Sequence, residues 1–164
     1  MLELVLLRHA HAILAIPNMQ DIDRPLSAEG KQQATLQGKQ LKKYKFLPQA
    51  IITSPALRTL TTAQLVAKVL HYPKEEIEKI PELYLAEVAD ILQTISEVPV
   101  SIQRLLLVGH NPGLSQVCRL IADPMMAELP TAGAVFLQWE ASSWDTVVEL
   151  DVQPIKIISL NLPY

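Results

Sequence analysis

The sequence predicts an α/β fold built on a largely parallel, buried β-sheet. Along most of the chain, short apolar runs alternate with longer amphipathic stretches, which is typical of buried parallel strands connected by helices. Near the C-terminus, two segments alternate apolar with polar residues and therefore favour an antiparallel pair of strands. Because 164 residues is close to the commonest domain size, we expect residues 1–164 to form a single domain.

The expected strands fall into two groups. The continuous apolar runs that predict parallel strands are residues 4–7, 50–53 and 105–108. The alternating segments that predict the antiparallel C-terminal pair are residues 135–139 and 148–152. A hairpin turn is expected between these two segments, at residues 142–145.

Helices are expected between the strands, where apolar residues recur at helical spacing. The first begins after an N-cap at Ser27 and continues to about Lys43, and the second ends before Pro73. A third is expected around residues 89–97, and a fourth has Pro112 in its first turn. The residues expected to face the core are Leu60, Ala63, Ala67 and Leu70 in the second helix and Leu114, Val117 and Leu120 in the fourth.

The composition excludes several classes of protein. A net charge of −3 disfavours a nucleic-acid-binding surface, which normally carries a basic excess. No apolar stretch approaches the roughly 20 residues that cross a bilayer, and the N-terminus lacks the features of a secretory signal. We therefore expect a cytoplasmic protein without nucleic-acid or membrane partners. The single cysteine, Cys118, rules out a disulfide framework within the chain and a cysteine-rich metal site.

Residues suited to catalysis follow the carboxyl ends of the predicted parallel strands. The first strand leads into Arg8 and His9, the second into the segment that carries Arg58, and the third into His110. Ligands of open α/β sheets bind at this edge, so we expect these four side chains to share one pocket. Ser54, at the end of the second strand, is expected to serve as a turn or cap residue.

The residue types at this edge point to phosphate chemistry. Arg8 and Arg58 carry permanently charged planar groups that match the oxygens of an anion, and an adjacent helix N-terminus adds amide donors. The imidazole of His9 is a competent nucleophile toward phosphorus when it is neutral, and the arginines lower its pKa. His110 is expected to be protonated and to donate to a phosphoryl oxygen. The sequence therefore predicts phosphoryl transfer through His9.

Five motifs, in order and spacing, resemble those of a known family. They are LLRHAHA at residues 6–12, DIDRPLS at 21–27, TSPALRTLTTA at 53–63, PEL at 81–83 and VGHNPGL at 108–114. The combination resembles the small phosphohistidine phosphatases of the SixA type, within the histidine phosphatase superfamily that also includes the phosphoglycerate mutases. One difference is Ala10, which stands where a glycine is usual in that family.

This resemblance implies a three-layer α/β/α, phosphoglycerate mutase-like fold and a covalent phosphohistidine intermediate. By motif, His9 matches the nucleophile, Arg8 and Arg58 match the phosphate-binding arginines, and His110 matches the second catalytic histidine. The resemblance implies no metal and no other cofactor. It also implies a phosphorylated protein as partner, namely the histidine-containing phosphotransfer domain of a signalling kinase.

The proton donor to the leaving group is the open question. Many family members place a glutamate shortly after the PEL-like segment, where this chain has Leu85. Glu87, Asp21 and Asp23 are alternative donors, or the enzyme has none, and the role of His11 is also open. A phosphohistidine substrate tolerates the absence of an acid, because imidazole leaves far more readily than an alkoxide.

Three other functions compete with this interpretation. The first is a phosphatase or mutase that acts on small phosphate esters with the same residues. The second is a metal-dependent hydrolase, since His9 and His11 mimic a His-x-His metal motif, although the barrels that carry it need about 250 residues. The third is a phosphate-binding module without catalytic activity.

Overall fold

A mixed sheet of six strands, in the order β3-β2-β4-β1-β5-β6, forms the middle layer of the molecule. The computed structural model describes residues 1–163. The strands are β1 (Leu2–Arg8), β2 (Ala50–Thr53), β3 (Glu78–Lys79), β4 (Arg104–Gly109), β5 (Ala134–Trp139) and β6 (Lys156–Ser159). Strands β1 to β4 are parallel, whereas β5 is antiparallel to both β1 and β6. The mostly parallel sheet with an antiparallel C-terminal pair is confirmed.

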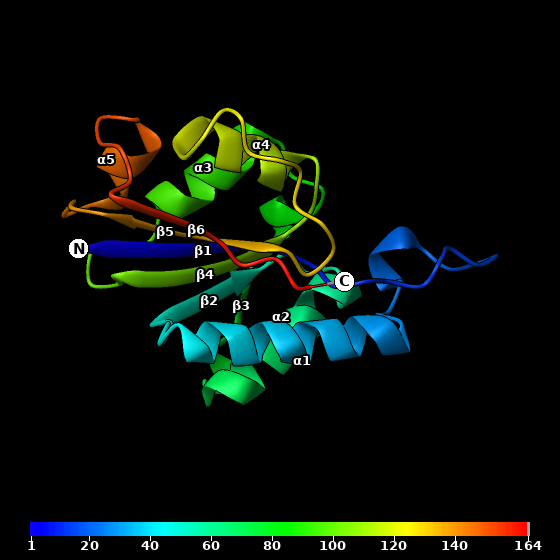
Figure 1. Ribbon diagram of the computed structural model, residues 1–164. Coiled ribbons are helices and arrows are strands. Elements are labelled where there is room, and N and C mark those ends of the chain that lie inside the picture. The colour runs from blue at the N-terminus through cyan, green and yellow to red at the C-terminus, as the bar shows by residue number, and fades with distance from the viewer. Residues whose placement is uncertain (164) are drawn as a thin grey trace.

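Helices cover both faces of this sheet and complete a three-layer α/β/α arrangement (Figure 1). The helices on one face are α1 (Ala28–Lys43) and α2 (Leu57–Leu70), and those on the other are α3 (Val88–Ser96), α4 (Gly113–Ile121) and α5 (Trp144–Val148). Short 3-10 helices lie in the connections, at η1 (Asp21–Asp23), η2 (Lys74–Glu76) and η3 (Pro81–Leu83).

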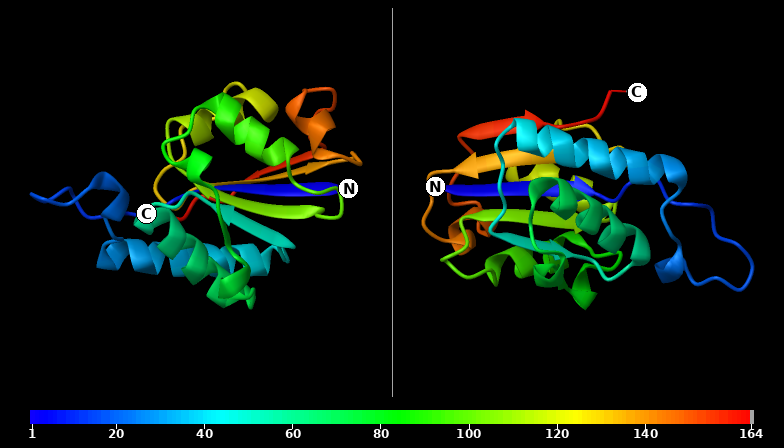
Figure 2. Two further views of the ribbon diagram at one scale, coloured as in Figure 1. Left: turned by 180° about the vertical axis from the view of Figure 1, so that it is seen from behind. Right: turned by 90° about the horizontal axis from the view of Figure 1, so that it is seen from below.

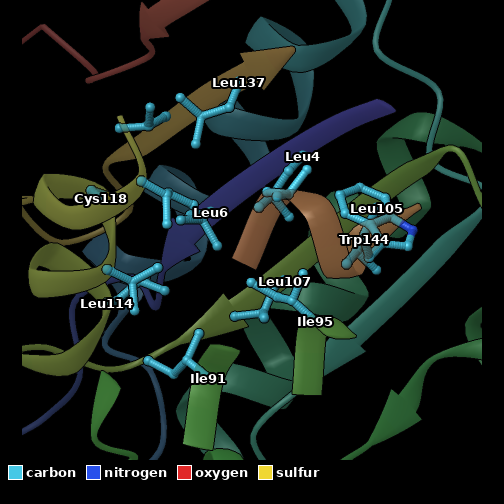
Figure 3. Packing of buried hydrophobic residues seen from close by; sticks show 14 of the residues in the cluster. Leu4, Leu6, Ile91, Ile95, Leu105, Leu107, Leu114, Cys118, Leu137 and Trp144 are labelled. Carbon is cyan, nitrogen blue, oxygen red and sulfur yellow. The ribbon is translucent and has the colours of Figure 1, made fainter. Parts of the chain in front are cut away.

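Two hydrophobic cores fill the spaces between the layers. Alternation along β1 sends Leu4 and Leu6 toward α3 and α4, and sends Val5 and Leu7 toward α1 and α2. Figure 3 shows the first of these cores, in which Leu4 and Leu6 contribute to a cluster that includes side chains of α3, α4 and α5. Cys118 is buried within it, and burial raises the pKa of its thiol to about 12, so this cysteine acts as a small apolar side chain.

The first turn of α1 is locked against the segment that follows β1. Ser27 caps the helix as expected, since its Oγ accepts a hydrogen bond from the Gly30 amide at 3.0 Å. Gly30 also packs directly on the backbone of His11, and a Cβ at this position would overlap the His11 carbonyl oxygen. This close approach fixes where the chain runs after the first strand.

The expected C-terminal strand at residues 148–152 and hairpin at 142–145 are wrong. Residues 144–148 form helix α5, which buries Trp144 and Val147, and the second antiparallel strand comes later, as β6. The apolar residues of this segment suit either periodicity over so short a length, and burial of Trp144 against α3 favours the helix. Leu120 was also expected in the core, but its side chain is 47% exposed.

Residues 12–20 form a loop that extends away from the rest of the molecule at the carboxyl end of β1 (Figure 2). Its base is held by a bridge between Ala12 and Leu26. In the part of the chain that the structure describes, no helix is long and apolar enough to span a membrane.

Replacement of Gly30 by alanine tests the close contact at the start of α1. The added methyl group must displace the His11 backbone, so we expect the free energy of unfolding to fall by about 1–3 kcal/mol, as for other overpacked sites. Urea denaturation monitored by circular dichroism measures the change. Lys31→Ala, at an exposed position one residue later, is the control and should differ from wild type by less than about 0.5 kcal/mol.

Candidate active site

The pairing of β1 with β4 brings the two predicted catalytic histidines together. Arg8 lies opposite Gly109 in the parallel register, and the His9 amide then donates to the Gly109 carbonyl at 3.1 Å. The ring centroids of His9 and His110 are consequently 5.4 Å apart. The end of β2 joins the same edge, because the Ser54 amide donates to the Val108 carbonyl at 3.2 Å.

An open pocket of about 390 Å³ lies at this edge of the sheet. All four predicted residues line it, together with others that the prediction did not include. The lining residues are Arg8, His9, His11, Ala12, Asp21, Arg24, Arg58, Leu85, His110, Asn111 and Thr131. With three arginines among them, the pocket is suited to an anion.

The hydrogen bond of His9 defines which of its nitrogens can attack. Nδ1 lies 2.7 Å from the carbonyl oxygen of Ala10, which only accepts, so Nδ1 carries the hydrogen and Nε2 keeps a lone pair. The pKa of His9 is lowered to about 4, mainly because the ring is buried. The hydrogen bond to Ala10 acts in the opposite direction, and the positive charges of Arg58 and Arg8 lower the pKa further. His9 is therefore neutral at pH 7, as a nucleophile requires.

His110 was expected to be protonated, but its surroundings favour the neutral ring. Burial lowers its pKa to about 3, with further contributions from His9 and Arg58. Arg58 donates from Nη2 to Nδ1 of His110 at 3.5 Å, so the hydrogen of the neutral ring lies on Nε2 and points to Ser54 Oγ at 2.7 Å. Ser54 thus orients His110, in addition to accepting a bond from the Ala56 amide as a turn residue.

Arg58 is 2% exposed and is held in place by one carboxylate. Its Nη2 lies 3.0 Å from Oδ2 of Asp21, and its Nη1 donates to the Asp21 carbonyl oxygen at 2.8 Å. These contacts fix the orientation of the guanidinium beside His110. Because Arg58 is the second residue of α2, the start of that helix sets its position relative to the histidines.

Arg8 is positioned by the loop that precedes β5. Its Nη1 donates to the Leu129 carbonyl at 2.9 Å, and Nδ2 of Asn111 donates to the same oxygen at 2.9 Å. The loop is fixed in turn, because the Leu129 amide donates to Ser115 Oγ, which itself donates to Asn111 Oδ1. One hydrogen-bonded network therefore joins Arg8 to the segment just after His110.

The structure disfavours all three carboxyl groups that the sequence offered as proton donors. A short hydrogen bond from the Tyr84 hydroxyl, 2.5 Å from Oδ2, is the largest of several effects that hold the pKa of Asp21 far below its usual range. Asp21 is therefore ionised at neutral pH and cannot donate a proton. Asp23 does not line the pocket, and Glu87 caps the N-terminus of α3.

Leu85 does line the pocket, at the place where the sequence comparison expects the family's acid. Its side chain is 53% exposed, and its backbone has a φ of 48°, which is rare for a residue other than glycine, asparagine or aspartate. The rim of the pocket therefore presents an apolar side chain on a residue whose backbone conformation is strained. His11 also lines the pocket, and its Nδ1 lies 2.7 Å from Ser27 Oγ, so this ring is tied to the cap of α1.

The sequence analysis assigned no role to several residues of the site, namely Arg24, Tyr84, Asn111 and Thr131. Arg24 and Asn111 lie inside the motifs at residues 21–27 and 108–114, which was a signal that they belong to the site. Tyr84 had no such signal, because only the fold brings its hydroxyl to Asp21 and its ring edge-on to His110, with centroids 5.6 Å apart. Among residues 1–163, no group of three or more histidine, cysteine, aspartate or glutamate side chains is arranged to hold a metal ion.

The chain belongs to the histidine phosphatase superfamily. The model of branch 1 of this superfamily matches residues 4–110, a segment that contains both histidines and both predicted arginines. An uncharacterised chloroplastic protein of Arabidopsis thaliana is 30% identical over 155 residues, which cover 90% of this chain and 71% of the relative. The protein is therefore a phosphatase of the class that uses a histidine nucleophile.

Solved structures show the same phosphoglycerate mutase-like fold. A protein assigned as the phosphohistidine phosphatase SixA of Agrobacterium tumefaciens superimposes with a TM-score of 0.79 at 25% identity, over 99% of both chains. The protein histidine phosphatase SixA complexed with tungstate gives 0.74 at 20% identity, over 97% of both chains. A mycobacterial glucosyl-3-phosphoglycerate phosphatase gives 0.73 at 16% identity, over 99% of this chain and 100% of its own.

Titration of His9 tests the electrostatics of the pocket. Because its pKa is lowered from 6.5 to about 4, His9 should stay neutral as the pH falls through 6.5 and should gain its proton only near pH 4. Nitrogen-15 NMR of the imidazole rings, with His9→Gln for assignment, measures both the midpoint and the tautomer. A midpoint near 6.5, or a hydrogen on Nε2 at pH 7, would contradict the arrangement described above.

Proposed function

We propose that the protein hydrolyses phosphohistidine on another protein, of the kind carried by histidine-containing phosphotransfer domains of signalling kinases. The observation that carries this proposal is the pocket itself. It combines a neutral, oriented histidine and three arginines with a single carboxyl group, Asp21, which is ionised. We propose His9 as nucleophile, with Arg8, Arg58 and His110 binding the phosphoryl oxygens.

The first step transfers the phosphoryl group to His9. Nε2 of His9 attacks phosphorus, and the bond between phosphorus and the substrate nitrogen breaks, with its electron pair returning to that nitrogen. A substrate ring that carries a hydrogen on its other nitrogen leaves as neutral imidazole. Arg8 and Arg58 stabilise the negative oxygens in the transition state, and the positive charge that develops on His9 strengthens the Nδ1–H bond to the Ala10 carbonyl.

His110 is suited to contact the same oxygens. A phosphoryl group beside it supplies negative charge, which favours the protonated ring and opposes the effects of burial and of Arg58. The contact with Ser54 holds the ring at Nε2, so a protonated ring donates to the phosphoryl oxygen from Nδ1, which then no longer accepts from Arg58. In this proposal His110 becomes a donor when the anion binds, not before.

In the second step, water attacks phosphorus and the bond to Nε2 of His9 breaks, with its electron pair returning to that nitrogen. His9 leaves as a neutral imidazole, and the protons of the water remain on the released phosphate. The group that leaves is of the same kind as in the first step, so neither step requires a carboxylic acid to protonate a departing oxygen. This match between the leaving group and the chemistry of the pocket favours a phosphohistidine substrate. We further propose that residues 1–164 form one catalytic domain and that the protein acts in cytoplasmic signalling.

The alternative is a phosphatase or mutase for small phosphate esters. Likeness in fold to a glucosyl-3-phosphoglycerate phosphatase, which has a TM-score of 0.73, favours this alternative. An ester needs a proton for its departing oxygen, and positioned acids typically supply about 10²–10⁴ in rate. The ionisation of Asp21 and the apolar side chain of Leu85 weigh against it.

A comparison of substrates distinguishes the two functions. We expect kcat/KM for a histidine-phosphorylated phosphotransfer domain to exceed that for phosphoglycerate and sugar phosphates by about 10² or more, the contribution that an acid would supply. Release of inorganic phosphate measures all three. His9→Ala is the control and should abolish turnover, and a preference for the esters would overturn the proposed substrate.

A gain of function at Leu85 tests why esters are excluded. We expect Leu85→Glu to raise the turnover of an alkyl phosphate ester by about tenfold or more, because the new carboxyl group lines the pocket and can protonate the departing oxygen. Phosphohistidine turnover should not rise, since its leaving group needs no acid. Leu85→Gln is the control, because glutamine has the shape of glutamate but no carboxyl group. An equal gain in ester turnover with Leu85→Gln would show that protonation is not responsible.

A further inference from the structure

The loop of residues 12–20 combines unusual exposure with an absence of charge. Its sequence, AILAIPNMQ, contains no charged residue, although 19% of the chain is charged. Leu14 is 85% exposed and Ile16 is 52% exposed, so both side chains present apolar surface to the surroundings. The views in Figures 1 and 2 agree that this segment projects beyond the helices and the sheet.

The base of this loop is held firmly despite its exposure. The Ile13 amide donates to the Pro25 carbonyl at 3.0 Å, and Arg24 donates from Nη1 to the Ile13 carbonyl at 2.7 Å. Arg24 also donates from Nε to Asp21 at 2.9 Å, and Asp21 in turn holds Arg58. The loop is therefore fixed by the same ion pairs that orient a phosphate-binding arginine.

The apolar loop is continuous with the rim of the pocket. Ala12, its first residue, lines the pocket, and so does Leu85, which is 53% exposed. A phosphoryl group that reaches His9 must bring the surface around its attachment point against this rim. A bound phosphoprotein would therefore meet apolar side chains around the mouth of the pocket and arginine side chains within it.

We propose that Leu14 and Ile16 are the docking surface for the protein that carries the phosphohistidine. This inference rests on the proposed function. The matching partner surface is an apolar face, such as one side of a helix, that surrounds a single anionic phosphoryl group. A phosphorylated sugar or glycerate has no apolar surface to bury there, and a membrane surface is a poor match because interfacial segments normally carry cationic residues.

The double variant Leu14→Ser/Ile16→Ser tests this docking surface. We expect the KM for a histidine-phosphorylated phosphotransfer domain to rise by about tenfold or more, since the variant loses the two apolar side chains that become buried against the partner in the complex. Hydrolysis of phosphoramidate, which is too small to reach the loop, should stay within about twofold of wild type because the base of the loop is unchanged. Leu47→Ser is the matched control, since Leu47 is 54% exposed but precedes β2 at the opposite end of the sheet.

Each other outcome overturns the inference. An unchanged KM for the phosphoprotein would show that the loop does not dock it, and equal losses with phosphoramidate would assign Leu14 and Ile16 a structural role. A loss of self-association or of binding to anionic vesicles, with the phosphoprotein KM unchanged, would assign the loop to another partner. If the wild-type enzyme hydrolyses phosphoramidate but not the phosphoprotein, the proposed substrate is wrong. The proposed docking surface, which depends on that substrate, is then wrong as well.

Discussion

The parallel pairing of β1 with β4 is the constraint on which the rest of the site depends. It sets Arg8 opposite Gly109, and the next residue of each strand is then a histidine. The amide of His9 continues the ladder through its bond to Gly109, so sheet hydrogen bonds hold together the backbone segments that carry the two rings. The hydrophobic cores on both faces of β1 also include residues of β4, so they stabilise this pairing.

Around this pair, charge is distributed so that the histidines stay neutral while the pocket stays cationic. Burial is the largest cause of the lowered pKa values of His9 and His110, and the arginines reinforce it. Asp21 prevents the arginines from forming an uncompensated cluster, because it accepts from both Arg24 and Arg58. The short bond from Tyr84, together with the contacts from Arg24 and Arg58, holds the pKa of that carboxylate far below its usual range. The pocket therefore has an anion-binding field but no carboxylic acid, and this combination matches a nitrogen leaving group.

Much of this arrangement could be predicted from the sequence, because its signals were local. The strand at residues 4–7, the Ser27 cap and the helix before Pro73 each depend on neighbours in sequence, and all were confirmed by the structure. The gathering of Arg8, His9, Arg58 and His110 in one pocket followed from a general rule for parallel sheets. The rule places the four residues at one edge of the sheet, and the adjacency of β2, β4 and β1 brings them into one pocket.

What could not be predicted depends on contacts between distant segments. The helix at Trp144 displaced an expected strand because burial against α3 outweighs a short alternating pattern. The neutral state of His110 before an anion binds could not be predicted, since its pKa depends on burial that no local pattern reveals. The bond between Tyr84 and Asp21 joins residues far apart in the chain, and it adds to the arginine contacts that lower the pKa of Asp21.

The central claim is that the phosphoryl group passes through Nε2 of His9. Rapid quenching of the reaction in alkali, which preserves phosphohistidine, followed by mass spectrometry and phosphorus NMR of the enzyme, tests this claim most directly. We predict a single phosphorylated residue, His9, with phosphorus on Nε2, because Nδ1 is committed to the Ala10 carbonyl. Phosphate on any other residue, on Nδ1 of His9, or no enzyme-bound phosphate during turnover would contradict the account.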